Sequence, residues 1–411
     1  MNILMMTNTY APVVGGLERS VRQFAEEYRK RGHRTLIVAP VFRGMPKREQ
    51  DVVRVPVPGV PSRALRGFKP DLVHAHHPFM LGGTALRVAY ARNLPLVFTH
   101  HTLFEHYTHL LPLDSPAVKR FVIRLAVGYA NLCDLVFAPS RSVQELLIRR
   151  GVRSPVAVVP TGLALERYRR GDGLRARRAE GIPSGAFVVG HVGRLSPEKN
   201  LDFLARAAAL FLRRHASARF LLVGEGPSLP RIVAAFRRWG VEDRLHCPGT
   251  LSGQRLIDSY HAMDLFAFSS KSETQGLVLL EAMAAGVPVA AIRGPGVVDL
   301  VRHGSNGYLL RRESIEEFAG ALNRFAEQPA RQKNRMRRQA METASGLSMD
   351  RCAERALESY AQIQNRRRTR RPLAGSGWAR AIRWFRAEWR LVRNYTGAFI
   401  TAGSETHAGP D

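Results

Sequence analysis

The sequence predicts an α/β protein with two doubly wound parallel-sheet domains and a basic amphipathic helix at its C-terminus. Short apolar runs alternate with longer helical patterns, which is typical of a parallel sheet covered by helices. This series breaks once, at a polar stretch rich in arginine and glycine over residues 167–185, and then starts again. A chain of 411 residues is also too long for one ordinary hydrophobic core, so two domains are expected.

The first series predicts an N-terminal Rossmann-like domain over residues 1–165. Leu17, Val21 and Phe24 fall on one face of a helix after the first strand, and Tyr28 extends that face. The expected strands are residues 3–6, 34–39, 72–75, 96–99, 135–138 and 155–159.

The second series predicts a second Rossmann-like domain over residues 166–365. Its last helix, at 351–364, is expected to return to the first domain. Two such domains would face each other across a cleft, because open α/β sheets bind ligands at the carboxyl ends of their strands. The expected strands are residues 187–191, 220–223, 265–267 and 287–290, with helices at 201–213 and 229–239.

The composition indicates an anionic partner. The chain has 62 basic and 34 acidic residues and a formal charge of +28, which is compatible with nucleic acid, anionic lipid or phosphorylated substrates. Three widely spaced cysteines indicate a reducing compartment. The N-terminus lacks the features of a signal peptide, and no apolar run reaches the roughly 18 residues of a membrane span. We therefore expect a cytoplasmic protein, soluble or peripheral at a membrane.

Two carboxylates, Glu273 and Glu281, bracket the start of a predicted helix. The residues Gln275, Gly276 and Leu277 lie at that start. A helix that opens on glycine binds phosphate with its amides, and flanking carboxylates can bind sugar hydroxyls. The segment therefore predicts a nucleotide-sugar site, although Glu281 could also be an ordinary solvated helix residue.

Cations and glycines occur at other expected strand ends. Arg194 and Lys199 follow one strand and precede a helix, so both could converge on a diphosphate; the alternative is two solvated cations. Gly15 and Gly16 follow the first strand and open a helix, where they would let the backbone approach a phosphate.

Together with residues 70–78 and 224–227, these segments resemble the family 4 glycosyltransferases of the GT-B fold, over residues 1–365. The resemblance implies a retaining, metal-independent hexosyltransferase. Its nucleotide-sugar donor, expected to be UDP-glucose, would be held mainly by the second domain, and no further cofactor is expected.

The resemblance also implies roles for individual residues. Glu273 would hold hydroxyls of the donor sugar, and Glu281 would hold the ribose. Arg194 and Lys199 would neutralise the diphosphate, and Gly16 would close the cleft onto it. The backbone amides at the helix start would come from Gln275, Gly276 and Leu277, although many family members have an aromatic residue in place of Gln275.

The first half is rich in histidine. We expect most of these residues to line the mouth of a cleft rather than to bind a metal, because no ordered ligand motif such as HExxH is present. His101 and Thr102 match the His-Thr position of the family, which implies that His101 lines the donor sugar and aids the acceptor hydroxyl. The neighbouring His100 is a weaker candidate for this role. The histidines are His74, His76, His77, His100, His101, His106 and His109.

Three short segments narrow the resemblance. Residues 98–107, 160–162 and 273–276 are similar to the diacylglycerol glucosyltransferases that make bacterial glycolipids. They imply glucose transfer to a membrane lipid such as diacylglycerol. One alternative is a polyprenyl-linked or soluble acceptor in surface polysaccharide or lipopolysaccharide assembly. Another is a nucleic-acid-binding protein, but the basic residues form no recognisable DNA- or RNA-reading motif, so nucleic acid is not the expected partner.

Residues 116–129 combine Lys119, Arg120 and Arg124 with an apolar helix face. In the family such a helix meets the membrane, whereas a core-facing helix with a solvated basic side is the alternative.

The C-terminal tail, residues 366–411, begins with a run of arginines and continues as an amphipathic helix. Trp378, Phe385 and Trp389 share one face, Trp384 widens it, and arginines that include Arg383 gather on the opposite side. Tryptophan beside arginine suits an anionic lipid surface, so we expect peripheral binding at the inner face of the cell membrane. Docking of this helix on the protein itself is the alternative.

Overall fold

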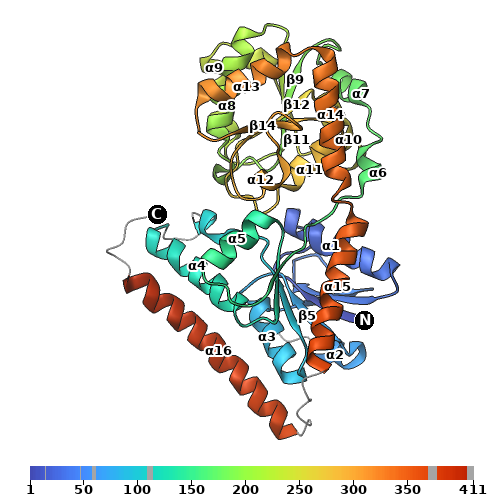
Figure 1. Cartoon of the computed structure of the whole chain (residues 1–411), viewed down its shortest axis with the longest axis vertical. Coiled ribbons are helices and arrows are strands. Elements are labelled where there is room, and N and C mark those ends of the chain that lie inside the picture. The colour runs from blue at the N-terminus through green and yellow to red at the C-terminus, as the bar shows by residue number, and fades with distance from the viewer. Residues whose placement is uncertain (14, 47, 58–61, 109–113, 369–376, 405–411) are drawn as a thin grey trace. The chain divides into compact units, whose positions relative to one another are not determined.

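A computed structural model describes the chain apart from residues 14, 47, 58–61, 109–113, 369–376 and 405–411. Its packing gives two compact units, one of Met1–Thr161 with Met349–Asp411 and one of Gly162–Ser348 (Figure 1). The boundaries thus fall at 161 and 348 rather than at 165 and 365. The late helix α15 (Met349–Arg368) belongs to unit 1 in full.

Unit 1 contains an eight-stranded sheet in the order β3-β4-β2-β1-β5-β6-β7-β8, in which only the β3–β4 pair is antiparallel. Its apolar strands are covered on both faces, as a parallel sheet requires. The strands are β1 (Asn2–Met6), β2 (Arg34–Pro40), β3 (Arg48–Glu49), β4 (Val52–Val55), β5 (Leu72–Ala75), β6 (Leu96–Thr99), β7 (Leu135–Ala138) and β8 (Val156–Val158).

The strands β3 and β4 were not predicted. Arg54 interrupts the apolar pattern of β4, yet its side chain is buried and donates to Glu49 Oε1 at 3.0 Å. This pairing compensates the charge of a buried arginine. The charged residue also breaks the apolar run by which a buried strand is recognised in the sequence.

Helices cover both faces of this sheet and include the end of the chain. Tyr360 of α15 is buried, and its ring stacks on Phe137 with centroids 5.5 Å apart. The helices are α1 (Gly16–Lys30), α2 (Ser62–Phe68), α3 (Leu81–Arg92), η1 (Phe104–His106), α4 (Pro116–Ala130), α5 (Arg141–Arg149), α15 and α16 (Gly377–Ser404).

Unit 2 contains a fully parallel six-stranded sheet in the order β11-β10-β9-β12-β13-β14. Successive residues of β10 alternate between two cores, with Phe220 and Leu222 on one face and Leu221 and Val223 on the other. The strands are β9 (Val188–Val192), β10 (Arg219–Val223), β11 (Leu245–Gly249), β12 (Leu265–Phe268), β13 (Val289–Ile292) and β14 (Gly307–Leu310). The edge strands β11 and β14 were not predicted.

The helices of unit 2 surround this sheet (Figure 1). They are α6 (Leu165–Tyr168), α7 (Gly173–Ala179), η3 (Pro197–Lys199), α8 (Leu201–Arg214), α9 (Leu229–Arg238), η4 (Glu242–Arg244), α10 (Gly253–Ala262), α11 (Leu277–Ala284), α12 (Val297–Leu300), α13 (Ile315–Glu327) and α14 (Ala330–Ser345).

The stretch 167–185, predicted to be a linker, is folded into unit 2. Asp172 caps α7 by accepting a hydrogen bond from the Arg175 amide at 2.9 Å. Arg175 also pairs with Asp258, and Arg177 with Asp264. These ion pairs hold a polar segment whose composition alone resembles a linker.

Candidate functional site

An ion pair joins two of the predicted site residues in unit 2. Lys199, at the end of η3, places Nζ 2.5 Å from Glu273 Oε1. Lys199 follows β9 and Glu273 follows β12, and these strands are parallel neighbours. The carboxyl ends of the strands therefore bring together two residues that lie 74 positions apart.

Glu273 is held in its ionised form. Burial by itself raises the pKa of this carboxyl, but the Lys199 ammonium and hydrogen bonds from Lys199 and Ser270 outweigh burial and lower the pKa below its usual value. The site thus offers a charged carboxylate, able to accept hydrogen bonds from hydroxyl groups.

Ser269 fixes the backbone beneath this pair. Its hydroxyl is buried at the end of β12 and lies 2.8 Å from the carbonyl oxygen of Lys199 and 2.9 Å from that of Asn200. This serine was not predicted, because one serine after a strand gives no signal by itself.

Arg194 follows β9 and remains 61% exposed at its side chain. Its guanidinium lies 3.3 Å from Glu198 Oε1, which also accepts from the Ser196 hydroxyl at 2.6 Å. Glu198 was not predicted. A ligand diphosphate would compete with this carboxylate for the arginine.

The first turn of α11 begins at Gly276, which has a φ of 80° and precedes Leu277. Gln275 is buried beside it. Gly296, with a φ of 71°, packs against this loop, and a Cβ there would lie 2.6 Å from the Gln275 nitrogen. The predicted amide-bearing helix start therefore exists, and a glycine that sequence analysis missed supports it.

Glu281 is buried within α11 rather than solvated. It accepts hydrogen bonds from the hydroxyls of Tyr260 at 2.6 Å and Tyr168 at 3.0 Å. The structure does not bring this carboxylate together with Glu273, and its contact with a ribose stays a prediction.

In unit 1, Gly15 precedes α1 and Gly16 begins it. Gly15 has an extended backbone that any residue adopts, but a Cβ there would lie 2.5 Å from Glu18 Oε2. The Glu18 carboxylate is the end of a flexible side chain that can move aside, so neither the backbone conformation nor this contact requires glycine at position 15.

The predicted histidines of unit 1 gather at the carboxyl ends of β5 and β6. His74, His76, His77 and His100 are buried, which corrects the expectation that they line a cleft mouth. Burial lowers the pKa of His74 and His77 to about 3 and that of His100 to about 4. These rings are therefore neutral at physiological pH. His109 lies outside the described residues.

His101 is less buried than its neighbour His100. Its Nε2 lies 2.9 Å from His76 Nδ1, and the two rings stack with centroids 5.1 Å apart. Across the part of the chain that the structure describes, no group of three or more His, Cys, Asp or Glu residues could hold a metal ion.

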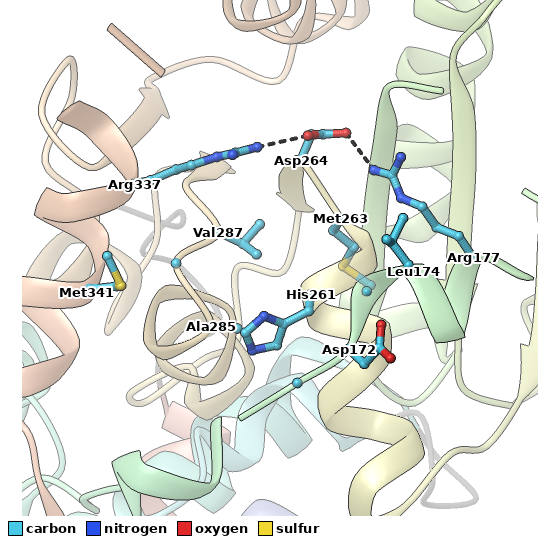
Figure 2. A pocket seen from close by; sticks show the side chains of 13 residues that line it. Asp172, Leu174, Arg177, His261, Met263, Asp264, Ala285, Val287, Arg337 and Met341 are labelled. Atoms are coloured by element: carbon cyan, nitrogen blue, oxygen red, sulfur yellow. Dashed lines mark hydrogen bonds and ion pairs between the residues drawn. The ribbon is translucent and has the colours of Figure 1, made fainter. Parts of the chain in front are cut away.

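A pocket of about 570 Å³ lies at the amino ends of the unit 2 strands (Figure 2). Its wall includes Asp264, which directly precedes β12, and Val287, which shortly precedes β13. Asp264 is bridged by Arg177 and Arg337. Because this pocket is at the amino ends of the strands, it is distinct from the Lys199–Glu273 pair at their carboxyl ends.

The predicted membrane residues of α4 differ in exposure. Lys119 and Arg124 are exposed, with Lys119 Nζ 3.4 Å from Asp114, whereas Arg120 is half-buried. The opposite face of α4 packs inward through Leu125 and Tyr129. The helix α4 thus packs on the core and keeps a basic outer side, and its contact with a membrane stays a prediction.

The helix α16 docks along α3 and α4 (Figure 1). Leu391 and Ala387 of α16 enter the core of unit 1. Asn394 Nδ2 donates to the Leu125 carbonyl at 3.2 Å, and Arg87 pairs with Glu388. The docking alternative is therefore observed.

Docking leaves the predicted aromatic stripe outward. Phe385 is 68% and Trp389 is 62% exposed, with Val392 continuing the stripe one turn on. The side chains of Trp378, Arg383 and Trp384 lie outside the described part of α16. Among all residues that the structure describes, no helix is long and apolar enough to cross a membrane.

Comparison with known proteins assigns the chain to a family. The model of "Glycosyltransferase Family 4" matches residues 14–167, and that of "Glycosyl transferases group 1" matches residues 174–343. A D-inositol 3-phosphate glycosyltransferase from Nocardia farcinica is 33% identical over 79% of this chain and 74% of its own length. The chain belongs to glycosyltransferase family 4. It is a hexosyltransferase with the GT-B fold, as predicted.

Other glycosyltransferases are similar to this chain over comparable lengths. An alpha-monoglucosyldiacylglycerol synthase from Streptococcus pneumoniae is 29% identical over 78% of this chain and 77% of its own. A GDP-mannose-dependent alpha-mannosyltransferase from Mycobacterium tuberculosis is also 29% identical, over 89% and 98%. The structure of Anabaena Alr3699/HepE in complex with UDP has a TM-score of 0.73 and 25% identity, and the match covers 88% of this chain and all of that one.

Proposed function

We propose that the protein transfers glucose from a nucleoside-diphosphate sugar to a lipid acceptor such as diacylglycerol. The Lys199–Glu273 pair beside the start of α11 carries the donor part of this proposal. It combines a cation for phosphate, a carboxylate for sugar hydroxyls and the amides of a helix start at the carboxyl ends of the unit 2 strands.

Each residue then has a separate task. Arg194 and Lys199 stabilise the negative charge that develops on the departing diphosphate, together with the amides at Gly276 and Leu277. Glu273 holds hydroxyls of the sugar, and Glu281 holds the ribose. His101 of unit 1 lines the transferred sugar.

The transfer retains configuration at the sugar. The bond from the anomeric carbon to the leaving phosphate breaks, and a bond from that carbon to the acceptor oxygen forms on the same face. The acceptor proton passes to the departing phosphate oxygen, so no separate carboxylate nucleophile is needed.

Names of relatives support a lipid acceptor. Proteins from Streptococcus pneumoniae and Acholeplasma laidlawii, 29% and 27% identical, are alpha-monoglucosyldiacylglycerol synthases. Mannosyl- and inositol-phosphate glycosyltransferases are similarly related, which favours as the second candidate a different hexose or a soluble or polyprenyl-linked acceptor.

The stripe on α16 supports transfer at an anionic membrane surface. Phe385, Trp389 and Val392 recur at helical spacing and are exposed, and the exposed Arg386 and Arg393 flank them. Aromatic rings insert at the headgroup level while arginines attract anionic lipid, and a formal charge of +28 adds to that attraction. These features support peripheral binding at the inner face of the cell membrane.

Transfer is tested by incubating the full chain with radiolabelled UDP-glucose, GDP-mannose and other nucleotide sugars in the presence of diacylglycerol vesicles. We expect label in the organic phase with UDP-glucose, and an α-linked product. Organic-phase label from another donor instead would show that the transferred sugar is not glucose. Transfer only to soluble acceptors would contradict the lipid proposal.

Membrane binding is tested by flotation with vesicles that contain anionic lipid. The double variant Phe385→Ser/Trp389→Ser should bind at least about tenfold more weakly than the native chain. The control is Ile148→Ser, which removes another large apolar residue of unit 1 that is 55% exposed. Equal flotation of both variants would contradict the role of α16, and preferential binding to duplex DNA would favour the nucleic-acid class.

A further inference from the structure

We propose that His76 is a positioning residue that donates a hydrogen bond from Nδ1 to Nε2 of His101 and so fixes the tautomer of His101. His101 then carries its own proton on Nδ1. The inference rests on the proposed role of His101 at the transferred sugar.

The two rings are held by neighbouring strands of one sheet. His76 directly follows β5, His101 lies two residues beyond β6, and these strands pair in parallel. The distance from His76 Nδ1 to His101 Nε2 is 2.9 Å, and the rings stack at 29°. The hydrogen bond therefore joins the carboxyl ends of two paired strands inside the sheet.

Both rings are neutral. Burial, followed by the proximity of other histidines, lowers the pKa of His76 and of His101 well below the usual value. A neutral imidazole has one N–H donor and one acceptor nitrogen, so one of these rings must donate and the other accept.

The second nitrogen of His76 decides the direction. His76 Nε2 is buried and has no hydrogen-bond partner among the described residues. If His101 donated, His76 would carry its proton on Nε2, where a buried N–H would lack an acceptor. Orphaned buried N–H groups are rarer in proteins than under-satisfied acceptors, so His76 carries its proton on Nδ1.

This direction limits what His101 can do. Its Nε2 lone pair is occupied by His76, and its Nδ1 is a donor, so it cannot take a proton from the acceptor hydroxyl. His101 instead offers an N–H to an oxygen of the sugar. This inference replaces direct help to the acceptor hydroxyl with contact to the sugar, and it agrees with transfer of that proton to the departing phosphate.

The tautomer is tested by ¹⁵N NMR of the full chain with ¹⁵N-labelled histidines. The signals of His101 are those that disappear in the variant His101→Gln. We expect His101 Nδ1 to be protonated and Nε2 unprotonated. The opposite pattern would overturn the proposal, whatever reaction the protein catalyses.

Two substitutions test the positioning role in transfer. His76→Leu should lower kcat at least about tenfold with a donor KM within about twofold, because the tautomer is lost while the donor site remains. His76→Asn, whose amide can replace the Nδ1 donor, should recover most of that loss. Equal losses in both variants would overturn positioning in favour of packing.

A further variant separates this inference from the proposed function. Unchanged transfer in His101→Ala would reject the proposed role of His101 at the sugar, while the NMR result would still report the direction of the hydrogen bond.

Discussion

Lys199 and Glu273 are largely buried charges, and burying either charge without the other would be unfavourable. Their side chains are only 16% and 17% exposed, so water screens them poorly. A bound sugar diphosphate would offer both residues new partners, with phosphate for the ammonium and hydroxyls for the carboxylate. The pair therefore keeps a charged site ready without a ligand.

Replacement of Glu273 tests this site at the level of one atom. Glu273→Gln should lower kcat/KM for the donor about 100-fold, equivalent to about 2.7 kcal/mol, because the amide cannot replace the carboxylate charge. Initial rates at varied donor concentration measure the effect. Glu242→Gln, in an exposed pair with Arg237, is the control and should act within about twofold. A loss of only a few-fold at Glu273 would reject the assignment.

Glu281 is a buried carboxylate that depends on two phenols. Tyr260→Phe removes the 2.6 Å hydrogen bond and should destabilise unit 2 by about 1–3 kcal/mol. Tyr168→Phe removes a 3.0 Å bond and should cost less. Thermal unfolding of the two variants checks the order, and equal midpoints with the native chain would show that the phenols do not support Glu281.

At the level of elements, the start of α11 depends on a loop from the next strand. Gly296 has no room for a side chain against Gln275. Gly296→Ala should raise the donor KM or lower kcat at least about tenfold, because the Cβ would push the donor loop away. Donor kinetics measure this displacement.

Gly304 provides a matched control for that variant. It has a φ of 76°, close to the 71° of Gly296, but a Cβ there would meet nothing within 4 Å. Gly304→Ala should therefore cost about 1 kcal/mol of stability from backbone strain and leave transfer unchanged. Similar kinetics in the two variants would show that strain rather than the clash matters.

At the level of the whole molecule, the two units differ in their buried histidines. In unit 1 the pKa values of His74, His77 and His100 fall to about 3–4, whereas in unit 2 only His191 falls as far, to about 4. A histidine with a depressed folded pKa stabilises the fold above its unfolded pKa of about 6.5. That contribution is lost as pH falls from 6.5 towards the folded pKa.

Unit 1 should therefore lose stability first in mild acid. Between pH 6.5 and 5 each such histidine removes up to about 1.4 kcal/mol of stability per pH unit, so several together weaken unit 1 more than unit 2. Hydrogen exchange at pH 7 and 5, corrected for intrinsic rates, should show the larger loss of protection in unit 1. A larger loss in unit 2 would contradict the assignment of neutral histidines.

Much of the fold was predictable because buried parallel strands have a continuous apolar pattern. All ten predicted strands appear, within two residues at each end. Strands with polar or turn-forming residues escaped, as Arg54 in β4 and Pro248 in β11 illustrate. The prediction of a linker at 167–185 was wrong because two of its arginines, Arg175 and Arg177, pair with aspartates distant in sequence.

The sequence by itself determined the two-sheet α/β architecture, the family 4 resemblance and the candidate residues, because periodicity and motif spacing are local properties. Only the tertiary structure decided which candidates meet. It joined Lys199 to Glu273, enclosed Glu281 between two tyrosines and paired His76 with His101. It also docked α16 with its aromatic stripe outward. These outcomes depend on burial and on contacts between distant segments, which sequence spacing does not encode.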